Sequence, residues 1–443
     1  MIAAGIMAMF QSTISAQEVK KFSLKEAQQY ALDNNYQIKN AKTDIEIAKL
    51  KVKENTAIGL PQIAGSVSYN NFLELPTQLI PGEFLGMPEG EFAEIQFGTQ
   101  HNATWAASIS QLVFSGQYLI GLQAAKVYET VTQSAYEKNE IEIKDAVAKA
   151  YYPVIIIKEN KAYLDSTLAS MKKMQYETEE YFNNGFVEDT DVDQLKLMIA
   201  DLETALVYLD NRLELATNML KFMLGLKPED QIEATESVDG LLSSVNKEFL
   251  ISSQFDYNSN IDYNILKKGE KLNYLQFKLR QSEYYPTVSA FYSYQQNDMS
   301  DDFTFLDFDH DWYSSQVLGL QLDIPIWSSG MRKHRVNQAK LELEKIKVQD
   351  VELQQRLNLT LETYRSEFNN SYLIYNNRMK NLEIGRKIYQ KTEIKYKEGI
   401  STSLDLSTAY NQYLQAEIDY LTSILDLLMK KSDLDKLLTK VAN

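Results

Sequence analysis

Residues 357–382 read LNLTLETYRSEFNNSYLIYNNRMKNL, a polar stretch that carries a regular apolar pattern. Its apolar residues recur at steps of four or three, at Leu357, Leu361, Tyr364, Phe368, Tyr372, Tyr375, Met379 and Leu382. This spacing keeps one apolar stripe of a helix facing a partner helix. No proline follows Pro325, so one helix can cover 331–397, 67 residues and about 100 Å long. That length exceeds a globular core and predicts one elongated body built by lateral helix packing.

The composition argues against several classes of function. The 443 residues include 45 basic and 61 acidic side chains, a net charge of −16, so we expect no nucleic-acid partner. The chain has no cysteine and three scattered histidines, which disfavours disulfides and metal centres. No polar constellation on converging loops indicates catalysis, so we predict neither an enzyme nor a bound cofactor. The 28 tyrosines fit a protein that crosses a membrane interface, although helix packing accounts for part of them.

The chain begins with a predicted signal peptide. Residues 1–16 are small and apolar, and Ile14-Ser15-Ala16 ahead of Gln17 is typical of a cleavage site. No later run reaches 18 apolar residues, so we expect no transmembrane helix in the exported chain. The protein is then expected to be periplasmic, secreted or part of a barrel.

Helices and strands alternate after the signal peptide. Ser23 followed by Glu26 is a capping box, and the helix it opens can run to Ala57. A β-hairpin is predicted over 60–115, and its central 75–100, with three prolines and four glycines, is predicted to be a loop.

A long helix follows the hairpin, and Pro153 is expected to kink or loosen it. It should end at a turn near Gly185. Asp189 or Thr190 is then expected to cap a helix that continues to Leu224.

The same order recurs in the second half of the chain, which is the strongest signal in the sequence. A helix from about Asn260 leads to a β-hairpin over 286–327, a long helix and a turn near Gly399. The two long helices match in length within one residue. We therefore predict a signal peptide (1–16), a first repeat (17–228), an equatorial linker (229–259) and a second repeat (260–443).

The last predicted strand separates its two faces most clearly. One face carries Leu318, Leu320, Leu322, Ile324 and Ile326. The other carries Gln321 and Asp323, which suits a membrane barrel with lipid outside and water inside better than a buried sheet. Four strands cannot close such a barrel, so several chains must contribute, and twelve strands from a trimer would leave a passage.

This layout resembles the TolC family of outer-membrane efflux proteins. The matching pieces are LPQ at 60–62, IPIWSSG at 324–330, FNNGFVEDTDV at 182–192 and YKEGISTSLDL at 396–406. The resemblance implies an α+β membrane protein. Its long coiled-coil helices would form a periplasmic α-barrel, and its four strands would join a trimeric 12-stranded β-barrel in the outer membrane of a Gram-negative bacterium.

The resemblance also implies roles for individual residues. Asp405 matches a position whose carboxylate ring lines the periplasmic entrance, and Tyr396 matches a tyrosine that hydrogen-bonds the aspartate matched by Asp191. Helix capping is the alternative role for both aspartates. The family often has a second acid three residues after the position of Asp405, where this chain has Thr408. An arginine that the family pattern leads us to expect near Ser401 is absent.

The same resemblance implies partners at the two turns. Gly185, Val187, Gly399 and Ile400 would contact a periplasmic adaptor (membrane fusion protein), although they also suit ordinary turns. The implied function is a passive exit duct in a tripartite efflux or secretion system, gated at its periplasmic tip and supplied by an inner-membrane transporter. The alternative is a soluble periplasmic coiled-coil scaffold or adaptor. It would explain the heptad pattern but not the apolar, lipid-suited face of the last predicted strand.

One loop outside this scheme is strongly acidic. It carries Asp298, Asp301, Asp302, Asp307, Asp309 and Asp311. A divalent-cation site is one interpretation, but the spacing fits no EF-hand, and a solvated loop is the other.

Overall fold

The computed structural model describes residues 19–307 and 310–441, so the predicted signal peptide lies outside the described residues. The chain divides into two compact units. The first, which we call the sheet unit, comprises Glu46–Thr132 and Lys267–Val348. The remaining described residues form the helical unit. Both predicted repeats contribute to each unit.

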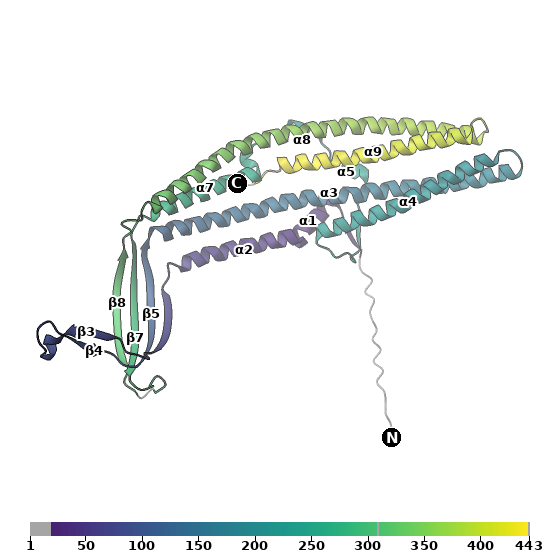
Figure 1. Ribbon diagram of the computed structural model, residues 1–443. Helices are drawn as coiled ribbons and strands as arrows, with labels where there is room; N and C mark the ends of the chain where they lie inside the picture. Colours follow the sequence, from purple (N-terminus) through teal and green to yellow (C-terminus); the bar gives the residue numbers. More distant parts are fainter. Residues whose placement is uncertain (1–18, 308–309, 442–443) are drawn as a thin grey trace, which may run out of the picture. The chain divides into compact units, whose positions relative to one another are not determined.

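The sheet unit is built on an antiparallel sheet with the strand order β2-β5-β7-β8. These strands are β2 (Gln62–Asn71), β5 (His101–Ser115), β7 (Thr287–Ser300) and β8 (Tyr313–Asp323). They connect, at one end of the sheet (Figure 1), to α2 (Tyr36–Ala57), α3 (Gly116–Asn183), α7 (Ile261–Ser282) and α8 (Met331–Lys397). Strands β2 and β8 are the two edges, and α8 has the bounds predicted from the sequence.

The register of the sheet confirms that its faces differ. Val67 pairs with Trp105, and Tyr292 of β7 pairs with Leu318 of β8. Since paired residues point to the same side, these side chains build one apolar face. Leu320 on this face is 76% exposed, which is unusual for a large apolar side chain and marks a surface that lacks its cover.

The end of β8 differs from the prediction. The ladder with β7 stops at Asp323, so Ile324 and Ile326 lie beyond the strand on which we placed them. Pro325 explains this end because it has no N–H to donate to a ladder. Both isoleucines are exposed.

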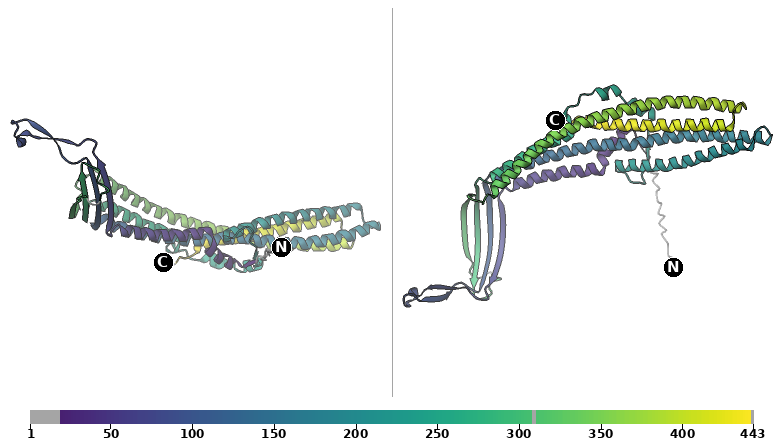
Figure 2. Two further views of the ribbon diagram at one scale, coloured as in Figure 1. Left: turned by 90° about the horizontal axis from the view of Figure 1, so that it is seen from below. Right: turned by 45° about the horizontal axis from the view of Figure 1, so that its top comes forward.

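The segment predicted to be a loop contains a further hairpin. Strand β3 (Thr77–Pro81) pairs with β4 (Phe92–Gln96), and the 3-10 turn η1 (Gly82–Leu85) lies between them. Each strand has five residues, which is too short for alternation to stand out among prolines and glycines. Figure 2 shows this hairpin at the end of the sheet opposite the helices.

The helical unit is built from long antiparallel helices. It contains α1 (Leu24–Asn34), α4 (Asp189–Leu224), α9 (Ser403–Leu438) and parts of α3 and α8. Figures 1 and 2 show α3 with α4, and α8 with α9, as two antiparallel pairs. The predicted stripe on α8 is covered where Leu357, Leu361 and Phe368 pack against α9. The periodicity therefore identified a true helix interface.

Short elements connect α4 to α7. They are β6 (Ile232–Ala234), α5 (Val238–Ser243), α6 (Lys247–Ser252) and η2 (Tyr257–Ser259). Strand β6 pairs in parallel with β1 (Lys20–Phe22). The buried hydroxyl of Tyr151 on α3 donates to the Phe22 carbonyl at 2.9 Å and accepts from the Glu236 N–H at 3.2 Å. One side chain thus binds both the end of β1 and the backbone just after β6.

A buried polar network joins α3 to α9. The Asp145 carboxylate accepts from Ser432 Oγ at 2.7 Å and from Lys149 Nζ at 2.9 Å. Lys149 also reaches Asp433 at 2.5 Å. Because every charge in this network has an opposite partner, the pairing offsets much of the desolvation penalty and fixes how α3 and α9 align.

The first helix is divided where we predicted continuity. Asn35 adopts an extended conformation, its Nδ2 donates to the Met223 carbonyl at 2.7 Å, and its Oδ1 accepts from the Gln37 N–H at 2.8 Å. The same side chain thereby caps α2 and binds the end of α4. Gly225 ends α4 with a φ of 74°, against the backbone of Asn34.

Gly225→Ala should disrupt this junction. A Cβ atom there would lie 2.5 Å from the Asn34 carbonyl oxygen, and the positive φ is unfavourable for alanine. We expect a loss of about 1–3 kcal/mol, seen as a lower thermal midpoint in detergent. Gly121→Ala on α3 is the matched control, since its Cβ meets no atom within 4 Å and alanine favours a helix. Equal midpoints for the two variants would contradict this account.

Candidate functional site

The predicted site residues lie at two helical turns and on one strand. The α3–α4 turn carries Gly185, Val187 and Asp191, and the α8–α9 turn carries Tyr396, Gly399, Ile400 and Asp405. Both turns belong to the helical unit. Leu318, Leu320 and Leu322 lie on β8 of the sheet unit.

The α3–α4 turn is closed by glycine. Gly185 has a φ of 75°, and the Phe186 N–H donates to the Tyr181 carbonyl at 2.9 Å. Glu188, rather than the expected Asp189 or Thr190, occupies the N-cap position, because its backbone is the extended residue before α4.

Asp191 completes this helix start. Its Oδ2 accepts from the Glu188 N–H at 3.2 Å, which satisfies a backbone donor outside the helix. The capping role that we kept open for Asp191 is therefore present in the structure.

The α8–α9 turn repeats this geometry. Gly399 has a φ of 68°, and the Ile400 N–H donates to the Lys395 carbonyl at 2.8 Å. Val187 is partly buried, whereas Phe186 and Ile400 are largely exposed apolar side chains at the turns. Each turn thus presents an uncovered apolar tip.

Asp405 caps α9 together with Thr402. Its Oδ2 accepts from the Thr402 N–H at 3.1 Å and from Thr402 Oγ1 at 2.8 Å. In return, the Asp405 N–H donates to Thr402 Oγ1 at 3.1 Å. The hydrogen bonds from the side chain and backbone of Thr402 hold the pKa of Asp405 below its ordinary value.

Tyr396 links the two helical pairs. Its hydroxyl lies 3.2 Å from Oγ1 of Thr178 on α3, whereas the resemblance implied a bond to Asp191. Burial raises the pKa of the Tyr396 hydroxyl, and the negative charge of Asp191 adds to this effect. Asp191 therefore acts on Tyr396 through its charge, while Thr178, which the sequence reasoning missed, makes the contact.

An aromatic cluster lies behind these turns and was also missed. Tyr389 of α8 stacks on Tyr413 of α9 with ring centroids 5.6 Å apart, and Tyr163 of α3 meets the edge of Tyr413 at 5.7 Å. Burial raises the pKa of Tyr389 and of Tyr163. The seven-residue step from Tyr389 to Tyr396 is the sequence signal that could have identified one side of it.

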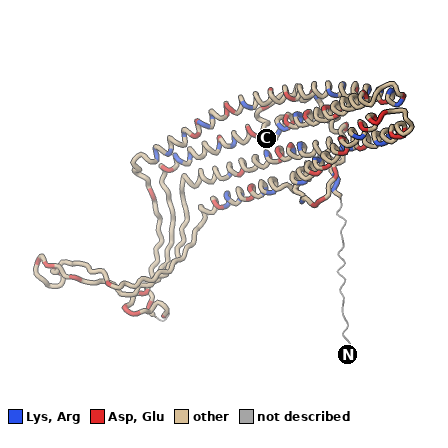
Figure 3. The backbone as a smooth tube through the Cα atoms, turned by 45° about the vertical axis from the view of Figure 1, so that its right-hand side comes forward, with Lys and Arg blue, Asp and Glu red and all other residues tan. Residues whose placement is uncertain are grey.

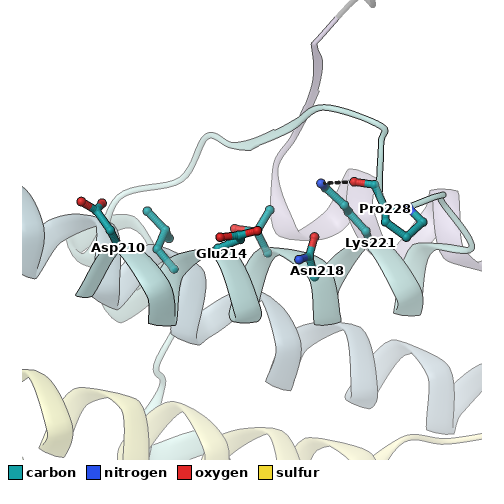
Figure 4. Close-up of a pocket in the computed structure, with 7 residues that line it drawn as sticks. Asp210, Glu214, Asn218, Lys221 and Pro228 are labelled. Atoms are coloured by element: carbon teal, nitrogen blue, oxygen red, sulfur yellow. Dashed lines mark hydrogen bonds between the residues drawn. The ribbon is translucent and has the colours of Figure 1, made fainter. Parts of the chain in front are cut away.

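A separate cavity of about 410 Å³ lies along α4 (Figure 4). Asp210, Glu214 and Asn218 come from one side of this helix, and Lys221 Nζ donates to the Pro228 carbonyl at 2.7 Å. Lys221 thus fixes the segment that follows α4 by a hydrogen bond to its backbone. The polar groups project from a single helix face and do not converge on a common point, so this arrangement carries no catalytic chemistry.

Charge is distributed unevenly in the sheet unit. The stretches 54–125 and 281–331 contain no lysine or arginine, and Figure 3 shows their acidic residues mainly in the loops. The four sheet strands carry only Asp298 and Asp323 as charged residues. Within the described residues no group of three or more metal-ligating side chains is assembled, and Asp309 lies outside them.

Comparison with known proteins identifies the fold and family. The family model described as "Outer membrane efflux protein" matches residues 275–439. This match covers most of the second repeat, from within α7 to the end of α9. None of the curated proteins matches the chain. Members of this family are transport channels rather than enzymes, and this protein is an outer-membrane efflux channel.

Solved structures extend the likeness to nearly the whole chain. VceC of Vibrio cholerae has a TM-score of 0.69 at 15% identity, with 94% of this chain and 96% of that chain covered. MtrE of Neisseria gonorrhoeae has a TM-score of 0.70 at 17% identity, with 94% and 89% covered. CmeC of Campylobacter jejuni has a TM-score of 0.68 at 17% identity, with 94% and 85% covered. The fold of this chain is therefore TolC-like. Among the described residues, no helix is both long and apolar enough to span a membrane.

Thr402→Ala should weaken the start of α9. Losing a threonine cap costs about 1 kcal/mol, so amides 403–406 should exchange faster with deuterium in detergent. Thr402 lowers the pKa of Asp405, so the ionised carboxylate stabilises the turn fully at pH values above the pKa of Asp405 in the unfolded chain. This stabilisation is lost as the pH falls through the lower pKa that Asp405 has in the folded protein. Thr408→Ala is the control, since Thr408 only bonds the Leu404 carbonyl within α9. Unchanged exchange in Thr402→Ala would reject the capping role.

Proposed function

We propose that three copies of this chain form the passive exit duct of a tripartite efflux or secretion system. The observation that supports this most strongly is the four-stranded sheet with two open edges and an exposed apolar face. Three such sheets joined edge to edge would place twelve strands in one barrel, with each β2 beside a neighbouring β8. The α-helical part would then extend into the periplasm.

We assign lipid to the apolar face of the sheet and water to the opposite face. Leu318, Leu320 and Leu322 would face lipid, with Ile324 and Ile326 following at the end of the strand. The opposite face carries Gln321, Asp323 and Phe291, whose ring has its outer end over Gly319. A Cβ at Gly319 would lie 2.6 Å from that ring, so glycine keeps the ring against the wall and out of the passage.

The helical turns would form the periplasmic gate. In a trimer, three copies of Asp405 would meet around the axis and attract cations, and Tyr396 with Asp191 would hold the entrance narrow. The exposed turns at Gly185, Val187, Gly399 and Ile400 would receive a periplasmic adaptor that connects to an inner-membrane transporter. Opening would then require the Tyr396–Thr178 contact to loosen as the two helical pairs separate.

The first test is assembly and conduction. We expect the mature protein, extracted in detergent, to have the mass of a trimer and to give discrete conductance steps in a planar bilayer. The alternative, a soluble periplasmic scaffold, predicts a protein that remains soluble without detergent and conducts nothing. That second result would reject the duct.

Asp405→Asn tests the gate. Asparagine can still accept the Thr402 hydrogen bonds, so this change removes the charge while keeping most of the cap. We expect a severalfold loss of cation preference and weaker block by multivalent cations, measured as reversal potential and single-channel current. Asp44→Asn removes an exposed charge on α2 and should leave both properties unchanged. Unaltered selectivity in Asp405→Asn would leave Asp405 with a capping role only.

A further inference from the structure

Part of the loop between β7 and β8 lies against the apolar face of the sheet. We call residues 301–307 and 310–312 the rim segment. A cavity of about 530 Å³ separates it from the strands and is lined by Val67, Trp105, Gln296, Phe305, Leu306 and Trp312. The rings of Phe303 and Phe305 also contact Tyr69 of β2, with centroids 5.5 and 5.7 Å apart. The segment therefore crosses back over neighbouring strands.

A buried carboxylate holds the rim segment in this place. Asp298 near the end of β7 pairs with Ala103, which pairs with Tyr69, so Asp298 lies on the apolar face. Its residue exposure is 2%. Thr304 Oγ1 donates to its Oδ2 at 2.8 Å, and His310 Nδ1 lies 2.9 Å from its Oδ1.

The position of this clamp has a physical reason. A carboxylate on a face that meets lipid is strongly unfavourable unless polar side chains accompany it. Thr304 donates a hydrogen bond to Oδ2, and the imidazole of His310 lies beside Oδ1 without forming a hydrogen bond; both residues belong to the rim segment. The segment is thereby fixed on the apolar side of the sheet and cannot fold over the polar face without exposing Asp298.

Two large apolar side chains project from the fixed segment. Leu306 is 70% exposed and Phe303 is 58% exposed. They continue the apolar face of the strands at the end opposite the helices. Since residues 281–331 contain no lysine or arginine, an apolar contact is available here but a salt link to an acidic partner is not.

We propose that the rim segment is a lipid anchor that inserts Leu306 and Phe303 into the boundary between acyl chains and headgroups of the outer leaflet. This inference rests on the proposed lipid-facing side of the sheet. Lipid is the favoured occupant because the anchor is continuous with that face, and aromatic and apolar side chains commonly gather where a barrel leaves the hydrocarbon. The Asp298 clamp keeps the anchor at that level.

Tryptophan fluorescence tests the anchor. The three native tryptophans are replaced in Trp105→Phe, Trp312→Phe and Trp327→Phe, and Leu306→Trp is added as the reporter. The trimer is reconstituted in phosphatidylcholine vesicles with brominated acyl chains, and iodide is added as an aqueous quencher. Leu320→Trp on β8 serves as the lipid reference and Phe84→Trp in η1 as the water reference, each in the same background.

We expect bromine to quench Leu306→Trp at least twofold more than Phe84→Trp, and iodide to quench it less. Adding Thr304→Ala and His310→Ala should raise iodide quenching at least twofold, whereas the exposed-strand control Ser314→Ala should not. Iodide quenching of Leu306→Trp equal to that of Phe84→Trp overturns the anchor when Leu320→Trp still responds to bromine. If Leu320→Trp also fails to respond, the lipid-facing assignment itself is rejected.

Discussion

Two unpaired edges on a four-stranded sheet constrain the rest of this protein. The backbone groups of β2 and β8 that point away from the sheet need partners, because a membrane interior offers no water to replace them. Another copy of the same sheet can provide those partners at both edges. The sheet also has one exposed apolar face, represented by Leu320, which only lipid or another protein can cover. An isolated chain therefore satisfies neither requirement.

In the helical unit, the backbone groups at the ends of short helices also need partners, and they find them where these helices meet end to end. Asn35 joins α1 to α2, and its side-chain amide donates a hydrogen bond to the Met223 carbonyl at the end of α4. Gly225 allows this close approach because it has no Cβ atom to meet the Asn34 backbone and because it tolerates a left-handed conformation. Two helices that could each have continued are thus stopped at one shared joint. The pairing lets them lie along the long helices without leaving their end groups unsatisfied.

The sequence predicted features that depend on long, regular patterns. The bounds of α8, the strand faces and both glycine turns follow from periodicity and from residues with special backbone freedom. Features that depend on a distant partner were not predictable in this way. The break at Asn35 is stabilised by Met223, and the Tyr396 contact depends on Thr178, which precedes it by more than 200 positions. The hairpin of β3 and β4 was hidden for a different reason, since five-residue strands give too little alternation.

Asp405 can cap α9 and also carry a negative charge at the entrance, although the sequence alone presents these two roles as alternatives. Both hydrogen bonds from Thr402 end on Oδ2, so among the described residues Oδ1 has no donor from the turn. The same bonds favour the ionised form, which opposes the rise in pKa that neighbouring carboxylates in a trimer would cause. A cap of this kind would therefore keep a ring of carboxylates charged at lower pH than an uncapped ring. The hydrogen bonds that stabilise the turn thus favour the electrostatic role proposed for the entrance.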